Sequence, residues 1–180
     1  MKYGEATTGQ TEAVINRMGG FQNWLRFAGG KGKIVFDLLT LLRTVRVAAQ
    51  PAVTTSDEYF KEAGVVWAND TFKAEFYGLE VPEAGDVELA ICSLEEDSLD
   101  KPILDELGEK AEISVSQFRA FLAANRKSQE WFIFYLTGRN GKRAVDARWG
   151  VGYGGWGVYA YSVVNPHRWV QGGRVVSQVS

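Results

Sequence analysis

Three strand-like runs near the C-terminal end, joined by glycine-containing turns, are the feature that most limits how this chain can fold. They span residues 131–136, 142–149 and 156–164. Asn140-Gly141 separates the first two runs, and a glycine-rich stretch at 150–157 separates the second from the third. Asn-Gly is typical of a tight hairpin because both residues readily adopt positive φ. Residues 129–180 are therefore predicted to form an antiparallel β-meander.

This segment holds more aromatic rings than a small sheet needs for its own core, including four of the chain's six tryptophans. Some of the rings should fill the interface between the sheet and the helices that cover it. The residues expected to do so are Trp131, Phe132, Phe134, Trp149 and Trp156. In the second run, Asp146 and Arg148 alternate with apolar residues and are expected on a polar face.

The remaining rings are predicted to form a binding face. Tyr159 and Tyr161 alternate with Trp156 and so point to the opposite side of their strand, while Tyr153 and Trp169 flank turns. Exposed aromatic side chains on a sheet can stack on sugars, on bases or on the side chains of a partner protein. The candidate binding residues are Tyr153, Tyr159, Tyr161, His167, Arg168 and Trp169.

Helical patterns dominate the chain before the meander. Capping residues, apolar residues three or four apart and terminal glycines predict helices at 11–18, 21–28, 56–63, 72–76, 100–108 and 114–125. Asp100 is expected to cap the fifth of these, and Ser114 with Gln117 should form a capping box on the sixth. Short strands are predicted at 65–68 and 87–92, with a turn at Asn69-Asp70 between them.

Residues 34–49 fit two secondary structures. The leucines follow a helical spacing, whereas Val45 and Val47 alternate with Arg46 as in a strand, so both remain open. The whole pattern predicts a single α+β domain over residues 1–180. It has a helical N-terminal segment at 1–33, and its short N-terminal and central helices pack on the C-terminal antiparallel β-meander.

The chain is poor in the side chains that most catalytic and metal sites use. It contains one cysteine, Cys92, and one histidine, His167, whereas sites built from these residues need several. We predict no catalytic residue, no cofactor and no metal. Cys92 lies in a predicted strand, where a lone cysteine packs as a small hydrophobe, typical of a reducing compartment. No stretch resembles a secretory signal or a membrane span, so a cytoplasmic protein without membrane contact is expected.

The formal net charge of −2 conceals a strong segregation of charge along the chain. Residues 54–115 carry seventeen acidic and four basic side chains, and residues 116–180 carry nine basic and two acidic ones. One interpretation is that these regions meet in the fold and neutralise each other. The other is a basic surface for an anionic partner.

Three functions fit these observations. The leading prediction is a non-enzymatic interaction module that uses the aromatic face for a protein partner. The alternative is a nucleic-acid-binding module in which basic residues act with the tyrosines, namely Arg139, Lys142, Arg143, Arg148 and Arg168. A third is a small carboxylate-based enzyme using the acidic runs at 95–97 and 105–106. The oligomeric state is left open.

Several motifs recur in an order that resembles a known family. They lie at 66–72, 98–108, 156–163 and 169–177. The chain is similar to short uncharacterised proteins present in many copies in reduced-genome candidate-phylum bacteria, which end in a comparable Trp–Ala–Ser-Val–Pro–Trp–Gly–Val–Ser pattern. The likeness covers about residues 34–180 and departs at 176–180, where the family usually ends in Phe-Ser-Arg-Asn. It implies one intact bacterial domain and no particular chemistry.

Overall fold

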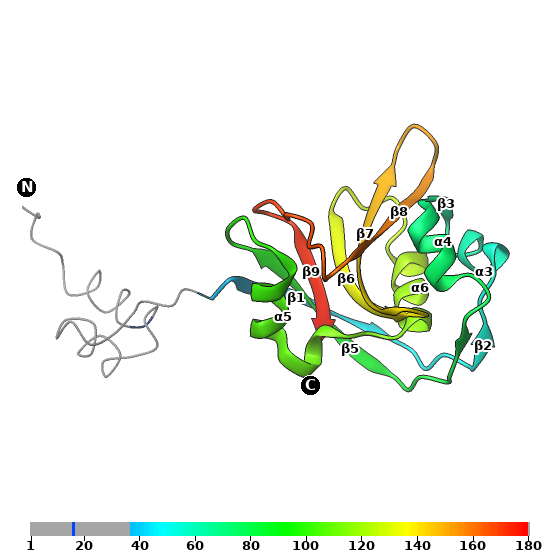
Figure 1. Ribbon diagram of the computed structural model, residues 1–180, viewed down its shortest axis with the longest axis horizontal. Coiled ribbons are helices and arrows are strands. Elements are labelled where there is room, and N and C mark those ends of the chain that lie inside the picture. The colour runs from blue at the N-terminus through cyan, green and yellow to red at the C-terminus, as the bar shows by residue number, and fades with distance from the viewer. Residues whose placement is uncertain (1–15, 17–36, 180) are drawn as a thin grey trace, which may run out of the picture. The chain divides into compact units, whose positions relative to one another are not determined.

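The computed structural model describes Asn16 and residues 37–179 (Figure 1). The described residues from Leu38 onward belong to one compact unit, Leu38–Ser180. The helices predicted at 11–18 and 21–28, and with them the helical segment 1–33, lie outside the described residues apart from Asn16. The described residues combine short helices with a large sheet, which confirms the α+β class.

A seven-stranded mixed sheet with the order β1-β5-β9-β6-β7-β8-β3 forms the centre of this unit. The strands are β1 Leu39–Val47, β3 Val65–Ala68, β5 Val87–Leu94, β6 Trp131–Gly138, β7 Gly141–Gly150, β8 Gly155–Ser162 and β9 Arg174–Gln178. The predicted meander is confirmed for β6, β7 and β8, which pair antiparallel. It is wrong for the end of the chain, because β9 returns to lie between β5 and β6 and runs parallel to β6. At the other edge β3 runs parallel to β8.

Residues 34–49, left open by the sequence, form an edge strand where the structure describes them. β1 pairs antiparallel with β5, from Leu39 opposite Leu94 to Val47 opposite Val87. Leu41 and Leu42 face outward and are exposed, so the leucine spacing does not mark a buried helical face. A bulge interrupts the pairing beside Leu42, and such bulges help to protect an edge strand from pairing with another chain.

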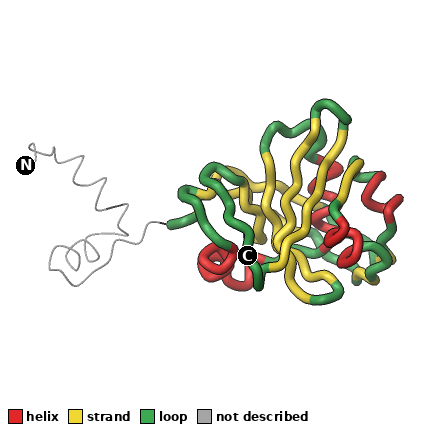
Figure 2. The backbone as a smooth tube through the Cα atoms, turned by 45° about the horizontal axis from the view of Figure 1, so that its top comes forward, coloured by secondary structure: helices red, strands yellow, loops and turns green. Residues whose placement is uncertain are grey.

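Helices cover the two faces of the sheet unequally (Figures 1 and 2). On one face lie α3 Asp57–Lys61, α4 Asp70–Phe76 and α6 Val115–Ala124; on the other lie α5 Asp100–Leu107 and the short 3-10 helix η1 Gly108–Ala111. Two further short strands, β2 Val53–Thr54 and β4 Glu80–Val81, pair with each other. Asn69, predicted in a turn, instead caps α4 by accepting from the backbone N–H of Phe72. No helix among the described residues is long and apolar enough to cross a membrane.

The larger core lies between the sheet and α6. The predicted capping box is present, with Ser114 and Gln117 exchanging side-chain and backbone hydrogen bonds. Phe121 is fully buried and meets Phe132 and Phe134 edge-on at ring-centroid distances of 5.0 and 5.3 Å. Such aromatic pairs add to the stabilisation that comes from the buried area alone.

A buried carboxylate ties α4 to the hairpin between β6 and β7. Glu75 accepts hydrogen bonds from the backbone N–H of Asn140 at 2.9 Å, from its amide at 3.1 Å and from Arg143 at 2.6 Å. Burial alone would raise the pKa of Glu75, but these donors outweigh it and hold the pKa below its usual value. The hairpin forms at the predicted place with Gly141 at φ +100°, although Asn140 does not adopt the positive φ expected of it.

Replacing Phe121 by Ala should lower the free energy of unfolding by about 3–5 kcal/mol, because it empties a fully buried aromatic site. Urea melts measure the change. Val151→Ala, at the most exposed apolar position of the β7–β8 turn, is the control and should change the free energy by less than about 0.5 kcal/mol. A loss below about 1 kcal/mol for Phe121→Ala would contradict this account of the core.

Glu75→Gln is expected to reduce stability at neutral pH by about 1–3 kcal/mol, since it weakens a buried charge-assisted network. A lowered folded-state pKa stabilises the fold above the unfolded-state pKa, near 4.3, and that contribution is lost as the pH falls through the folded-state pKa. The difference between wild type and variant should therefore shrink towards acid pH. Melts at several pH values test this, with the exposed Glu80→Gln as control; a pH-independent difference would refute the charge-based explanation.

Candidate interaction face on the aromatic side of the sheet

A row of aromatic rings runs along β8 on the sheet face opposite α6. Trp156, Val158 and Ala160 point into the α6 core, so the alternate residues Tyr159 and Tyr161 lie on the other side, as predicted. Their ring planes differ by only 8° and their centroids are 6.5 Å apart. The two rings thus stand side by side with the spacing of alternate residues on a strand.

Trp67 of β3 joins the row from the neighbouring strand. Its ring lies 4.4 Å from that of Tyr159, because β3 pairs with β8. Trp67 is 45% exposed and Tyr159 is 36% exposed, so both rings remain accessible. Trp67 was missed as a site residue: the strand at 65–68 was predicted, but its position beside β8 rests on a parallel pairing with no local signal.

Tyr153 extends the row at the β7–β8 turn. It is 62% exposed, and its ring lies over the backbone at Gly150 and Gly157. A Cβ atom at Gly150 would collide with this ring, and one at Gly157 would come within 3.3 Å of its hydroxyl oxygen. The two glycines therefore leave the space in which Tyr153 lies against the strands.

His167 closes the opposite end of the row. Its ring stacks on Tyr161 at 4.6 Å with 14° between the planes, and Trp169 meets both rings edge-on at 5.8 and 4.9 Å. We call the accessible part of this row the aromatic ladder. It consists of Trp67, Tyr153, Tyr159, Tyr161 and His167.

Trp169 does not belong to the exposed ladder, contrary to prediction. It is only 1% exposed and packs in the second core, which lies between the sheet and α5. Its indole N–H donates to the buried Asp100 at 2.7 Å. Trp131, expected at the interface between the sheet and the helices, packs against this second core, with its ring 6.1 Å from that of Trp169.

An ion pair between a buried carboxylate and an exposed arginine adjoins the ladder. Asp146 of β7 lies opposite Tyr159, and Arg148 donates through Nε to both of its oxygens at 3.1 and 2.9 Å. The Arg148 guanidinium also lies 4.7 Å above the ring of Trp131. Asp146 is almost completely buried, so the polar face expected for β7 is covered at this position. Burial raises the pKa of Asp146, although the Arg148 hydrogen bonds oppose the change.

The five basic residues of the nucleic-acid alternative all have acceptors within the fold. Arg143 pairs with Glu75, Lys142 with Glu112 at 3.3 Å, Arg148 with Asp146, and Arg168 with Asp97 at 3.2 Å. Arg139 donates to the backbone carbonyls of Ala74 and Tyr77. These contacts link the acidic middle of the chain to its basic C-terminal part.

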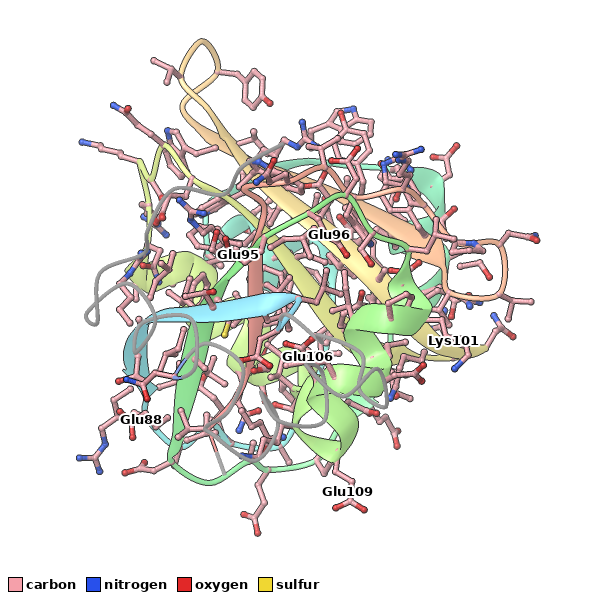
Figure 3. All side chains as sticks on the ribbon, turned by 90° about the vertical axis from the view of Figure 1, so that its left-hand side faces the viewer. Glu88, Glu95, Glu96, Lys101, Glu106 and Glu109 are labelled. Carbon is pink, nitrogen blue, oxygen red and sulfur yellow. The ribbon has the colours of Figure 1, made fainter. Side chains whose placement is uncertain are left out.

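The acidic runs do not form a shared site. Figure 3 shows Glu95 and Glu96 set apart from Glu106. Glu106 accepts from the backbone N–H groups of Leu38 and Leu39 at 2.8 and 2.9 Å, and so fixes the start of β1. Asp105 pairs with Lys101 on the same helix. Within the described part of the chain, no three His, Cys, Asp or Glu side chains are placed to hold a metal ion.

Cys92 lies buried in β5, as predicted, and burial raises the pKa of its thiol. Of the six candidate residues, the structure brings Tyr153, Tyr159, Tyr161 and His167 into the ladder. Arg168 is exposed beside it.

Comparison with protein-family models, curated proteins and solved structures gives no match, so the resemblance to the candidate-phylum family stays a prediction.

Proposed function

We propose that this domain is a non-enzymatic interaction module whose aromatic ladder receives an extended segment of a partner protein. The observation that carries this proposal is the run of accessible rings on one open side of the sheet, with Trp67, Tyr153 and Tyr159 all more than a third exposed. Tryptophan and tyrosine are enriched among the residues that dominate protein–protein binding energies. Contiguous exposed apolar surface often marks a protein–protein interaction site.

The spacing of the rings supports an extended partner segment. The Tyr159 and Tyr161 centroids are 6.5 Å apart. Alternate side chains on one face of a strand repeat at about 6.6 Å, twice the rise per residue. A strand-like segment lying along β8 would therefore place alternate side chains against successive rings.

The pairing of the cations favours a protein partner over nucleic acid. Nucleic-acid affinity depends on lysine and arginine side chains that are free to neutralise phosphates. Here Arg143, Lys142 and Arg168 are paired with carboxylates, and Arg148 is paired with Asp146 beside the ladder itself. A phosphate backbone would have to break these ion pairs first.

The lone buried Cys92 fits our further proposal that the module acts in the bacterial cytoplasm.

Trp67→Ala and Tyr159→Ala should each weaken partner binding by about 30-fold or more, the usual effect of losing one aromatic anchor. Peptides displayed as a random library are selected on the wild-type protein, and the Kd of each selected peptide is then measured for wild type and variants. Because both rings are partly exposed, the melting midpoints should change little. Val164→Ser, at an exposed apolar position outside the ladder, is the matched control and should retain full binding.

Two outcomes would overturn the proposal. One is a set of selected peptides that bind both ladder variants as tightly as the wild type. The other is recovery of nucleic acid, rather than protein, from cell extract, with affinity that collapses between low and moderate salt. That second result would favour the basic surface over the ladder.

A further inference from the structure

Asp100 is a buried carboxyl group that the ladder does not use directly. It was expected to cap α5, but Leu99 occupies the cap position and the Asp100 side chain is fully buried. Its Oδ1 accepts from the Tyr135 hydroxyl at 3.0 Å and from the Trp169 indole N–H at 2.7 Å. Its Oδ2 is equally buried and has no hydrogen-bond partner among the described residues.

The contacts of Asp100 lead directly to one end of the ladder. Trp169 is held to the start of α5 by two backbone hydrogen bonds with Ser98, of 3.0 and 2.8 Å, in addition to its bond to Asp100. The Trp169 ring in turn meets Tyr161 and His167 edge-on. The order of contact is therefore Asp100, Trp169, and then the stacked pair Tyr161 and His167.

The hydrogen-bond arrangement matches a carboxylic acid better than a carboxylate. Both donors converge on one oxygen, as they would on the carbonyl oxygen of a neutral acid, while an ionised Oδ2 would be left buried with no donor. Burial raises the pKa of Asp100, and the hydrogen bonds from Trp169 and Tyr135 only partly offset that effect.

We propose that Asp100 is the positioning residue of the aromatic ladder, holding Trp169 through an un-ionised carboxyl group and thereby setting the Tyr161–His167 pair. The effect of Asp100 on partner binding rests on the proposed function, whereas the effect of Asp100 on the positions of the rings does not. The titratable groups that face this carboxyl are Tyr135 from β6 and His167 from the segment after β8, and Asp146 of β7 faces His167 in turn. Lys101 and Asp105 of α5 pair with each other in solvent.

Three variants test the proposal without any ligand. Asp100→Asn keeps an acceptor oxygen, Asp100→Leu keeps the approximate size and removes both oxygens, and Asp105→Asn changes an exposed carboxylate on the same helix. NMR spectroscopy follows hydrogen exchange of the Trp169 indole N–H and the cross-relaxation among the Trp169, Tyr161 and His167 rings. We expect the Asn variants to match wild type. Asp100→Leu should accelerate indole exchange by about tenfold or more, because one buried hydrogen bond is lost, and should weaken the Tyr161–His167 contact.

The titration of Asp100 and the pH dependence of stability distinguish this proposal from a purely structural role of the residue. The carboxyl carbon resonance of Asp100 should titrate above the ordinary aspartate value of about 3.9. A raised folded-state pKa stabilises the fold below the unfolded-state pKa, and this contribution is lost as the pH rises through the folded-state value. The stability of wild type relative to Asp100→Asn should accordingly fall as the pH rises through the Asp100 midpoint.

Either of two results overturns the proposal. One is unchanged ring contacts and indole exchange in a folded Asp100→Leu protein. The other is an Asp100 midpoint at or below the ordinary aspartate value of about 3.9, a test that holds even if Asp100→Leu does not fold. If the rings move in Asp100→Leu but the peptides selected on wild type bind as before, the positioning role stands and the proposed function of the ladder fails. If Trp67→Ala abolishes binding while Asp100→Leu leaves the rings in place, the proposed function of the ladder stands and the positioning role of Asp100 fails.

Discussion

The two-residue alternation of β8 is the constraint on which the rest of this structure depends. One set of its side chains, led by Trp156, fills the core beneath α6, where the Trp156 indole N–H donates to the Leu122 carbonyl. The other set, Tyr159 and Tyr161, is left on the face that α5 covers only in part. Because both sets belong to one strand, the packing that stabilises the fold also fixes the direction of the exposed rings.

Charged side chains from distant segments of the chain pair with one another, most of them at partly exposed positions. The acidic middle of the chain and the basic C-terminal part meet through Glu75 with Arg143, Glu112 with Lys142, and Asp97 with Arg168. This confirms the interpretation that the segregated charges neutralise each other in the fold. Beside the ladder, the buried Asp146 is paired with the exposed Arg148.

Local features of this fold could be predicted from sequence, and contacts between distant segments could not. The Asn140-Gly141 hairpin, the Ser114 capping box and the outward direction of Tyr159 each follow from neighbouring residues. The parallel placement of Trp67 beside Tyr159 and the burial of Trp169 depend on partners about 90 and 70 residues away in the chain. Trp169 flanks a turn and was therefore predicted to be exposed. Its burial follows only from the contact with the Asp100 carboxyl group, which accepts its indole N–H.

The bare backbone beneath Tyr153 makes the ladder sensitive to residues that never touch a partner. Tyr153 reaches its place because Gly150 presents no side chain there. Any larger residue at position 150 would displace the ring and shorten the ladder at the end nearest the β7–β8 turn, leaving every other ring where it is. Under the proposed function, a substitution at this one glycine would change the binding face without changing any other ladder residue.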